Sequence, residues 1–144
     1  LHKRFIALDL GSDKYFTIFY GVFNTKDGSF KYSNAGHNCI PIKFNSEEIT
    51  LLKTNGFPIS SIFNEINYTE NEIKLKLEDK ILFYTDGITE VKNIHGEEFG
   101  IERIIKIIKE NKKDILNRIV NNVENFRWGE QEDDFAIVLM EVLN

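Results

Sequence analysis

The sequence has 144 residues, of which 42% are hydrophobic, and a formal net charge of -5. This length suits one folded domain with one core. No apolar stretch reaches the ~20 residues needed to cross a bilayer, so we expect no membrane contact by this segment. The mild acidity argues against nucleic-acid binding, which depends on basic patches that neutralise phosphates. The single cysteine, Cys39, excludes an internal disulfide and a cysteine-rich metal site, and favours a reducing, cytoplasmic location.

Aromatic, β-branched and alternating apolar residues predict strands in the first 85 residues. The stretch Thr25–Gly28 is typical of a hairpin turn between the first two strands, and Thr54–Pro58 is typical of a loop. The predicted strands cover residues 15–24, 29–34, 39–44, 48–52, 71–77 and 80–85.

The last third of the chain changes to a helical period. Four of the five isoleucines from residue 101 to 108 follow an i, i+3, i+4, i+7 spacing, which predicts one face of a helix. Asp114 is placed to cap a second helix with its own apolar face. A polar loop over 127–132 and a final strand over 134–143 follow. Consecutive strands, two adjacent helices and a last strand predict an α+β protein with antiparallel sheets. The inner faces are predicted to hold Ile101, Ile104, Ile105 and Ile108 in the first helix, and Ile115, Ile119, Val120 and Val123 in the second.

Two carboxylates stand at the ends of apolar runs. Asp86 follows the predicted strand over 80–85, and Asp133 precedes the last predicted strand. A carboxylate fixed at the end of a packed strand is costly to desolvate unless a positive charge lies beside it. Hard divalent ions such as Mg²⁺ and Mn²⁺ prefer oxygen ligands and keep water molecules that can be activated. The pattern therefore indicates part of a metal-dependent phosphatase site.

A series of short motifs follows in a recognisable order along the whole chain. Together they resemble the C-terminal part of the bacterial serine/threonine phosphatase domains of the sporulation stage II protein E (SpoIIE) type, in the PPM superfamily. No single motif is decisive, whereas the ordered series is much more specific. The motifs are Phe16-Thr17 with Tyr20-Gly21, Asn34–His37, Thr54–Pro58, Tyr84–Gly87 with Glu90, Glu98–Gly100, and Asp133-Asp134.

The resemblance implies an αββα sandwich that binds two Mn²⁺ or Mg²⁺ ions, with no organic cofactor. By motif, Asp86 and Asp133 would be metal-ligating catalytic residues, while Asp134 and Gly87 would lie beside them and orient a ligand or water. A hydroxide bridging the ions would attack phosphorus. The implied substrate is a phosphorylated serine or threonine on a small regulatory protein of the anti-sigma-factor antagonist type. The parent protein would be cytoplasmic, or membrane-anchored through another domain.

The sequence also departs from this family. Its upstream Gly-Gly-Asp and Asp-x-x-Gly-His-Gly motifs, which supply the remaining metal ligands, do not occur here, and Asp9–Asp13 is interpreted as an ordinary polar loop. We therefore expect residues 1–144 to be a single phosphatase domain truncated on its N-terminal side, and inactive as it stands. The alternatives are a catalytically degenerate module that binds a protein partner or forms a homodimer, and a structural fragment whose open sheet edge self-associates.

Each candidate residue also has a simpler interpretation. Asp-Gly after a strand is a common turn signal, so Asp86 has a purely structural alternative. The acidic residues around Asp133 and Asp134 have the alternative of a solvated loop. The other notable side chains are expected to be structural: His37 fixing a turn, His95 exposed in a loop, His2 at a frayed end, Cys39 buried, and Trp128 covering the core. For Trp128 the alternatives are shielding of the site and binding of a partner.

Overall fold

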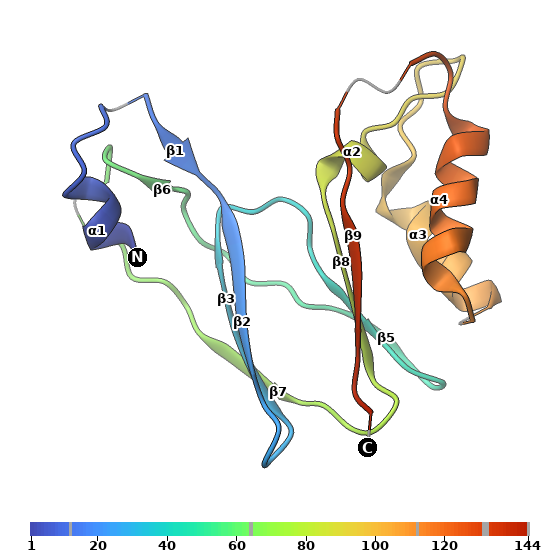
Figure 1. The fold of residues 1–144 in the computed structure, drawn as a ribbon, viewed down its shortest axis with the longest axis horizontal. Coiled ribbons are helices and arrows are strands. Elements are labelled where there is room, and N and C mark those ends of the chain that lie inside the picture. Colours follow the sequence, from blue (N-terminus) through green and yellow to red (C-terminus); the bar gives the residue numbers. More distant parts are fainter. Residues whose placement is uncertain (12, 64, 112, 131–132, 144) are drawn as a thin grey trace. The chain divides into compact units, whose positions relative to one another are not determined.

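The structure is a computed structural model that describes residues 1–144 except 12, 64, 112, 131, 132 and 144. The described residues divide into two compact units, one formed by residues 1–38 and 53–76 and the other by 39–52 and 77–144 (Figure 1). Antiparallel strands and helices occur together, which confirms the predicted α+β class. None of the helices in these ranges has the length and hydropathy needed to span a bilayer.

The first unit is built around a long hairpin. Strands β2 (Ile18–Asn24) and β3 (Ser29–Ala35) pair antiparallel, and β7 (Asn71–Lys74) adds to the other side of β3. The turn is fixed by Asp27, whose carboxylate accepts hydrogen bonds from the Ser29 hydroxyl at 2.7 Å and its backbone N–H at 2.9 Å. The remaining elements are helix α1 (His2–Ile6) and the short pair β1 (Tyr15–Phe16) and β6 (Ile59–Ser60).

Two of the sequence motifs contact each other in this unit. The side chain of Asn34 accepts the N–H of His37 at 2.7 Å and donates to its carbonyl at 2.9 Å, which closes the turn. Gly56 lies so close that a Cβ atom there would come within 1.8 Å of the Asn34 carbonyl oxygen. Gly36, with φ +72°, also has no room for a Cβ atom, because Pro58 packs against it. These motifs therefore define a packed turn, which the backbone of His37 closes. A structural role of the His37 side chain stays a prediction.

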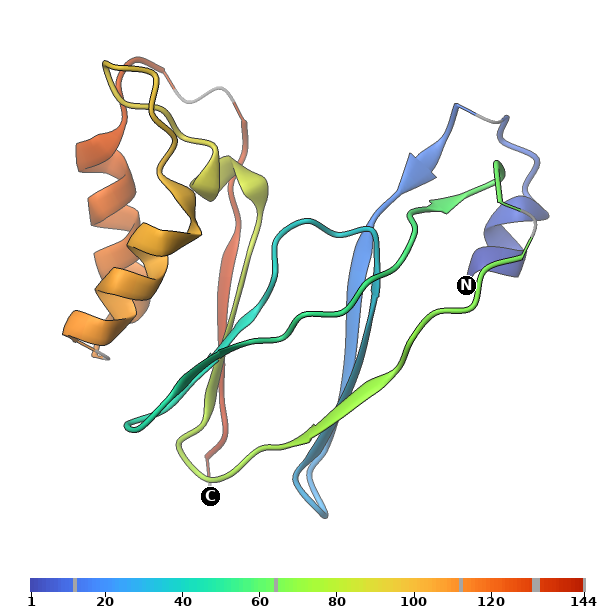
Figure 2. The same ribbon diagram turned by 180° about the vertical axis from the view of Figure 1, so that it is seen from behind.

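The second unit is a sheet covered by helices. Within the described ranges its strands have the order β5-β4-β8-β9, all antiparallel. Helices α3 and α4 lie side by side on one side of β8 and β9, as Figures 1 and 2 show from opposite directions. The elements are β4 (Ile42–Phe44), β5 (Ile49–Leu51), β8 (Lys80–Tyr84), α2 (Asp86–Thr89), α3 (Gly100–Glu110), α4 (Ile115–Phe126) and β9 (Ile137–Glu141).

The core of this unit joins the sheet to the two helices. Burying such aliphatic side chains stabilises the fold by roughly 1.5–3 kcal/mol each. The helices predicted from periodicity are confirmed, but the inner face of α3 is centred on Ile104, Ile107 and Ile108, whereas Ile105 is only partly buried. The fully buried side chains of this core include Ile42, Phe44, Leu82, Ile88, Phe99, Ile104, Ile108, Ile115, Ile119 and Val123.

A buried ion pair lies at one end of the same sheet. The Lys43 ammonium is 3.3 Å from a carboxylate oxygen of Asp79 and 2.7 Å from one of Glu48. Only 1% of the Asp79 side chain is exposed, and its other oxygen accepts a hydrogen bond from the Asn45 amide at 2.7 Å. Lys43 and Asp79 both have partners, so this network contains no isolated buried charge. It fixes the β4–β5 and β8–β9 strand pairs at this end of the sheet.

Several predicted boundaries are wrong. The strand predicted over 39–44 begins only at Ile42, since Pro41 has no N–H to donate to a ladder. The last strand covers 137–141 rather than 134–143. Helices α1 and α2 and strand β6 were not predicted, because each is too short to show a period. His2 is buried in α1, with its ring nitrogen Nε2 2.9 Å from the Ser60 carbonyl oxygen, so it is not at a frayed end.

Candidate active site

The segment that follows β8 and the segment that precedes β9 are held side by side. The two strands pair in register up to Tyr84 and Ile137. Beyond that pair, the Thr85 N–H donates to the Ala136 carbonyl at 3.1 Å, and the Ala136 N–H donates to the Thr85 hydroxyl oxygen at 2.9 Å. The ends of the two apolar runs singled out in the sequence are therefore neighbours, as predicted.

Asp86 is the first residue of α2, directly after this pairing. Its backbone carbonyl accepts the Glu90 N–H at 2.8 Å, and its side-chain oxygen Oδ1 accepts the Gly87 N–H at 3.1 Å. The side chain is exposed, so the carboxylate is held by a rigid backbone and still open to a ligand. The simple turn expected after the strand is thus the first turn of a short helix.

Gly87 permits a close approach between the two segments. It is buried, and a Cβ atom at this position would lie 2.5 Å from the carbonyl oxygen of Asp134. Only a residue without a side chain fits there without moving backbone. This contact fixes the chain at Asp134, next to Asp133, against the start of α2.

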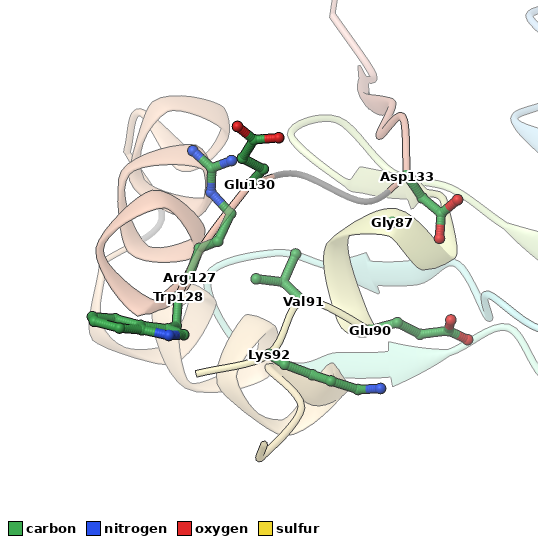
Figure 3. A pocket seen from close by; sticks show the side chains of 8 residues that line it. All are labelled: Gly87, Glu90, Val91, Lys92, Arg127, Trp128, Glu130 and Asp133. Atoms are coloured by element: carbon green, nitrogen blue, oxygen red, sulfur yellow. The ribbon is translucent and has the colours of Figure 1, made fainter. Parts of the chain in front are cut away.

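A small cavity of about 80 Å³ opens beside this contact. Asp133 and Gly87 both line it, and Figure 3 shows the Asp133 carboxylate beside the start of α2, with Glu90 on the same side. The cavity is large enough to hold water molecules. Its lining residues are Gly87, Glu90, Val91, Lys92, Arg127, Trp128, Glu130 and Asp133.

The electrostatics of this region are mixed. Glu90, Glu130 and Asp133 contribute negative charge to the cavity, and Lys92 and Arg127 contribute positive charge. Arg127 is engaged with Glu124 in an ion pair. The nearby thiol of Cys39 has its pKa raised to about 11, first by burial and then by the negative charges of Asp86 and Glu90. Both Asp86 and Glu90 therefore lie near enough to Cys39 to disfavour its thiolate form.

Three of the four predicted site residues are joined by these contacts: Gly87 touches the Asp134 carbonyl and shares the cavity with Asp133. Asp86 follows the β8 end, and its side chain is not among those that line the cavity. The strand start predicted at Asp134 is wrong, because β9 begins at Ile137. The assignment of these residues as metal ligands stays a prediction.

Sequence reasoning missed part of the cavity lining, namely Lys92 and Arg127. Glu90 was noticed only as part of a motif. Trp128 is 67% exposed, so the prediction that it covers the core is wrong. The signal available in the sequence was its position within a polar loop, directly before the acidic residues. His95 is exposed and Cys39 is buried, as predicted.

The side chains present do not by themselves form a complete site for divalent ions. In the described residues no group of three or more histidine, cysteine, aspartate or glutamate side chains is placed to hold one. Asp86, Asp133 and Glu90 supply oxygen donors of the kind that Mg²⁺ and Mn²⁺ prefer. These carboxylates fit part of a ligand set. Two ions with octahedral coordination require more ligands than these side chains provide.

Comparisons with known proteins agree with this geometry. The phosphatase domain of the cell fate determinant SpoIIE from Bacillus subtilis (Mn presoaked) has a similar structure, with a TM-score of 0.67 and 21% identity over 88% of this chain and 56% of that one. Protein IcfG of Synechocystis is 32% identical over 96% of this chain. The phosphoserine phosphatase RsbU of Bacillus subtilis is 23% identical over 96% of it. The chain spans 22% of IcfG and 42% of RsbU, so it matches a part of each.

The fold is thus that of the PP2C-like phosphatase domains of the PPM superfamily. The family model of stage II sporulation protein E (SpoIIE) matches residues 2–143. The chain belongs to the SpoIIE family.

Proposed function

We propose that this chain is the C-terminal part of a metal-dependent phosphatase domain that removes phosphate from serine or threonine of a regulatory phosphoprotein. Membership of the SpoIIE family and the PP2C-like fold support the reaction class. The name of RsbU, a phosphoserine phosphatase, supports phosphoserine as the substrate group. By the same resemblance, the partner is a small protein of the anti-sigma-factor antagonist type.

The observation that carries this proposal is the adjacency of the two acidic segments. Asp86 and Asp133 are far apart in sequence, yet the Thr85–Ala136 hydrogen bonds and the Gly87–Asp134 approach hold their backbones together. Carboxylates on segments held side by side repel each other, and a cation between them relieves this repulsion. We propose Asp86 and Asp133 as metal ligands, with Asp134 and Gly87 positioning them.

The proposed metal is Mn²⁺ or Mg²⁺, which lowers the pKa of bound water and so supplies a nucleophile near neutral pH. The manganese soak of the SpoIIE phosphatase domain supports manganese as the first choice. Since the described residues form only part of a ligand set, the other ligands would come from a preceding segment of the parent protein. We therefore expect residues 1–144 alone to be inactive.

The test is hydrolysis of p-nitrophenyl phosphate by the parent protein as Mn²⁺ is varied. Asp86→Asn and Asp133→Asn keep the side-chain shape but remove the charge. Each is expected to lower kcat by about 100-fold or more, because even groups that merely orient a metal ligand are worth roughly 10–100-fold. Both should also weaken Mn²⁺ binding measured by calorimetry.

Asp13→Asn is the matched control, since Asp13 is an exposed aspartate whose partner is its neighbour Lys14. It should leave turnover and Mn²⁺ affinity unchanged. Full Mn²⁺-dependent turnover in both Asp86→Asn and Asp133→Asn would refute the assignment of the ligands. Absence of turnover in the wild-type parent, with Mn²⁺ bound or not, would favour the degenerate binding module instead.

A further inference from the structure

Trp128 is a tryptophan held in an exposed position. It follows the end of α4, is 67% exposed, and is the only tryptophan of the chain. Its backbone N–H donates to the Lys92 carbonyl at 2.9 Å, so the residue is anchored to the segment that follows α2. Tryptophan is enriched at the centres of protein interfaces, where it contributes large apolar area. An anchored, exposed tryptophan is thus suited to binding a partner.

Trp128 lies next to the candidate active site. Trp128 and Asp133 line the same cavity. Figure 3 shows Trp128 on one side of this cavity and the Asp133 and Glu90 carboxylates on the other, with Val91 between them. A polypeptide bound with one residue at Asp133 would therefore continue across Val91 toward the indole ring.

Lys92 provides a charge that suits an acidic partner. Its side chain lines the cavity and extends toward the side where Glu90 lies (Figure 3). Among the described residues no ion pair involves Lys92, whereas Arg127 is paired with Glu124. Unpaired ammonium groups at the rim of an interface bind phosphate and carboxylate groups by charge-assisted hydrogen bonds.

We propose that Trp128 and Lys92 form a docking surface for the phosphorylated segment of a protein substrate. The indole ring would pack against an apolar side chain that flanks the phosphoserine, and Lys92 would attract the phosphate group. This inference rests on the proposed function and adds the residues that distinguish a phosphoprotein from a small phosphate ester. Trp128 and Lys92 are binding residues in this scheme and take no part in bond breaking.

Binding can be measured directly, because Trp128 is the only intrinsic tryptophan fluorophore of the 144-residue chain. The probe is a ten-residue peptide with a central phosphoserine flanked by leucines, and its unphosphorylated twin is the comparison. We expect the phosphorylated peptide to shift Trp128 emission to shorter wavelength in a saturable manner, and the twin to bind about tenfold more weakly. Lys92→Ala should remove this difference, whereas Lys106→Ala, at an exposed lysine of α3, should preserve it.

Kinetics of the parent protein provide the second measurement. Trp128→Ala is expected to lower kcat/KM for the phosphopeptide about tenfold more than kcat/KM for p-nitrophenyl phosphate, since interface tryptophans often contribute this much. Ile94→Ala is the matched control: Ile94 is 60% exposed in the α2–α3 connection, which also contains Lys92, but it does not line the cavity. It should leave both substrates unaffected.

The outcomes separate this inference from the proposed function. If the parent hydrolyses both substrates and Trp128→Ala affects them equally, or neither, the docking surface is refuted and the phosphatase assignment remains. If the parent hydrolyses neither substrate but the phosphopeptide shifts Trp128 emission, the docking surface is supported and catalysis is refuted. An emission spectrum unchanged by the phosphopeptide refutes the docking surface in either case.

Discussion

Gly87 and Asp134 form a tight contact between the two candidate metal-binding segments. The carbonyl oxygen of Asp134 lies only 2.5 Å from the position that a Cβ atom of residue 87 would occupy. Because the obstructing atom belongs to the backbone, no side-chain rotation can relieve the overlap. The spacing between the start of α2 and the segment before β9 therefore depends on this glycine.

Gly87→Ala should separate these segments. We expect a loss of about 1–3 kcal/mol in the free energy of unfolding, as for other overpacked buried sites. In the parent protein we also expect weaker Mn²⁺ binding. Gly96→Ala is the control, because nothing lies within 4 Å of its Cβ position and only the cost of its positive φ applies. Denaturant unfolding compares the two; equal losses would contradict a special role of Gly87.

The buried pair of Lys43 and Asp79 leads to a second prediction. Asp79→Ala should lower the free energy of unfolding by about 3–5 kcal/mol, since it leaves the Lys43 ammonium with less compensation in a site where only 10% of its side chain is exposed. Lys106→Ala is the exposed control, with an expected change below about 1 kcal/mol. Urea titration measures both. Similar values would show that the buried pair is not important for stability.

Arg103 connects α3 to the end of α4. Its guanidinium donates to the carbonyls of Phe99 at 2.7 Å and Glu98 at 2.8 Å, and its carbon Cζ lies 4.4 Å from the ring centre of Phe126. Lysine keeps the charge but not the planar fork, so Arg103→Lys should destabilise the chain by about 1–2 kcal/mol. Lys109→Ala, exposed on the same helix, is the control. Thermal unfolding followed by circular dichroism tests this; an unchanged Tm would contradict it.

Cys39 gives a pH-dependent prediction. Burial, together with the charges of Asp86 and Glu90, raises the pKa of its thiol from 9.0 to about 11. The folded state thus favours the protonated thiol, so its contribution to stability is complete below pH 9 and is lost as the pH rises from 9 to about 11. At pH 8 a thiol reagent should react slowly with the folded protein and rapidly in guanidinium. Equally rapid reaction in both would contradict the burial of Cys39.

The sequence was most informative where a pattern extends over many residues. The helical spacing of Ile104 and Ile108 repeats over three turns, and α3 was predicted correctly. The hairpin of β2 and β3 is set by Asp27 and Gly28, local turn signals that need no tertiary contact. These features depend on residues that are close together in the sequence, so a single sequence contains the information needed to predict them.

The features that were missed depend on contacts between distant residues. Helix α2 has four residues and shows no period, and it forms where β8 ends against Ala136. The backbone of Trp128 is placed by the Lys92 carbonyl that accepts its N–H, and these two residues are 36 positions apart in the sequence. The neighbouring placement of the segments at Asp86 and Asp133 was predicted because each followed or preceded an apolar run. The close approach between Gly87 and Asp134 could not be predicted, because it depends on the path of the chain at Asp134.

The β8–β9 register has a consequence for how this domain tolerates change in length. Helices α3 and α4 lie between β8 and β9 in the chain. Insertions in the loop that joins α3 to α4 would therefore leave the pairing of β8 with β9 in place. A one-residue deletion within β9 would instead turn the side chains on one side of the deletion to the opposite face, and a shift of the N-terminal side would displace Asp133 relative to Asp86. Length variation among homologous chains should therefore gather between the helices and be absent from the two strands.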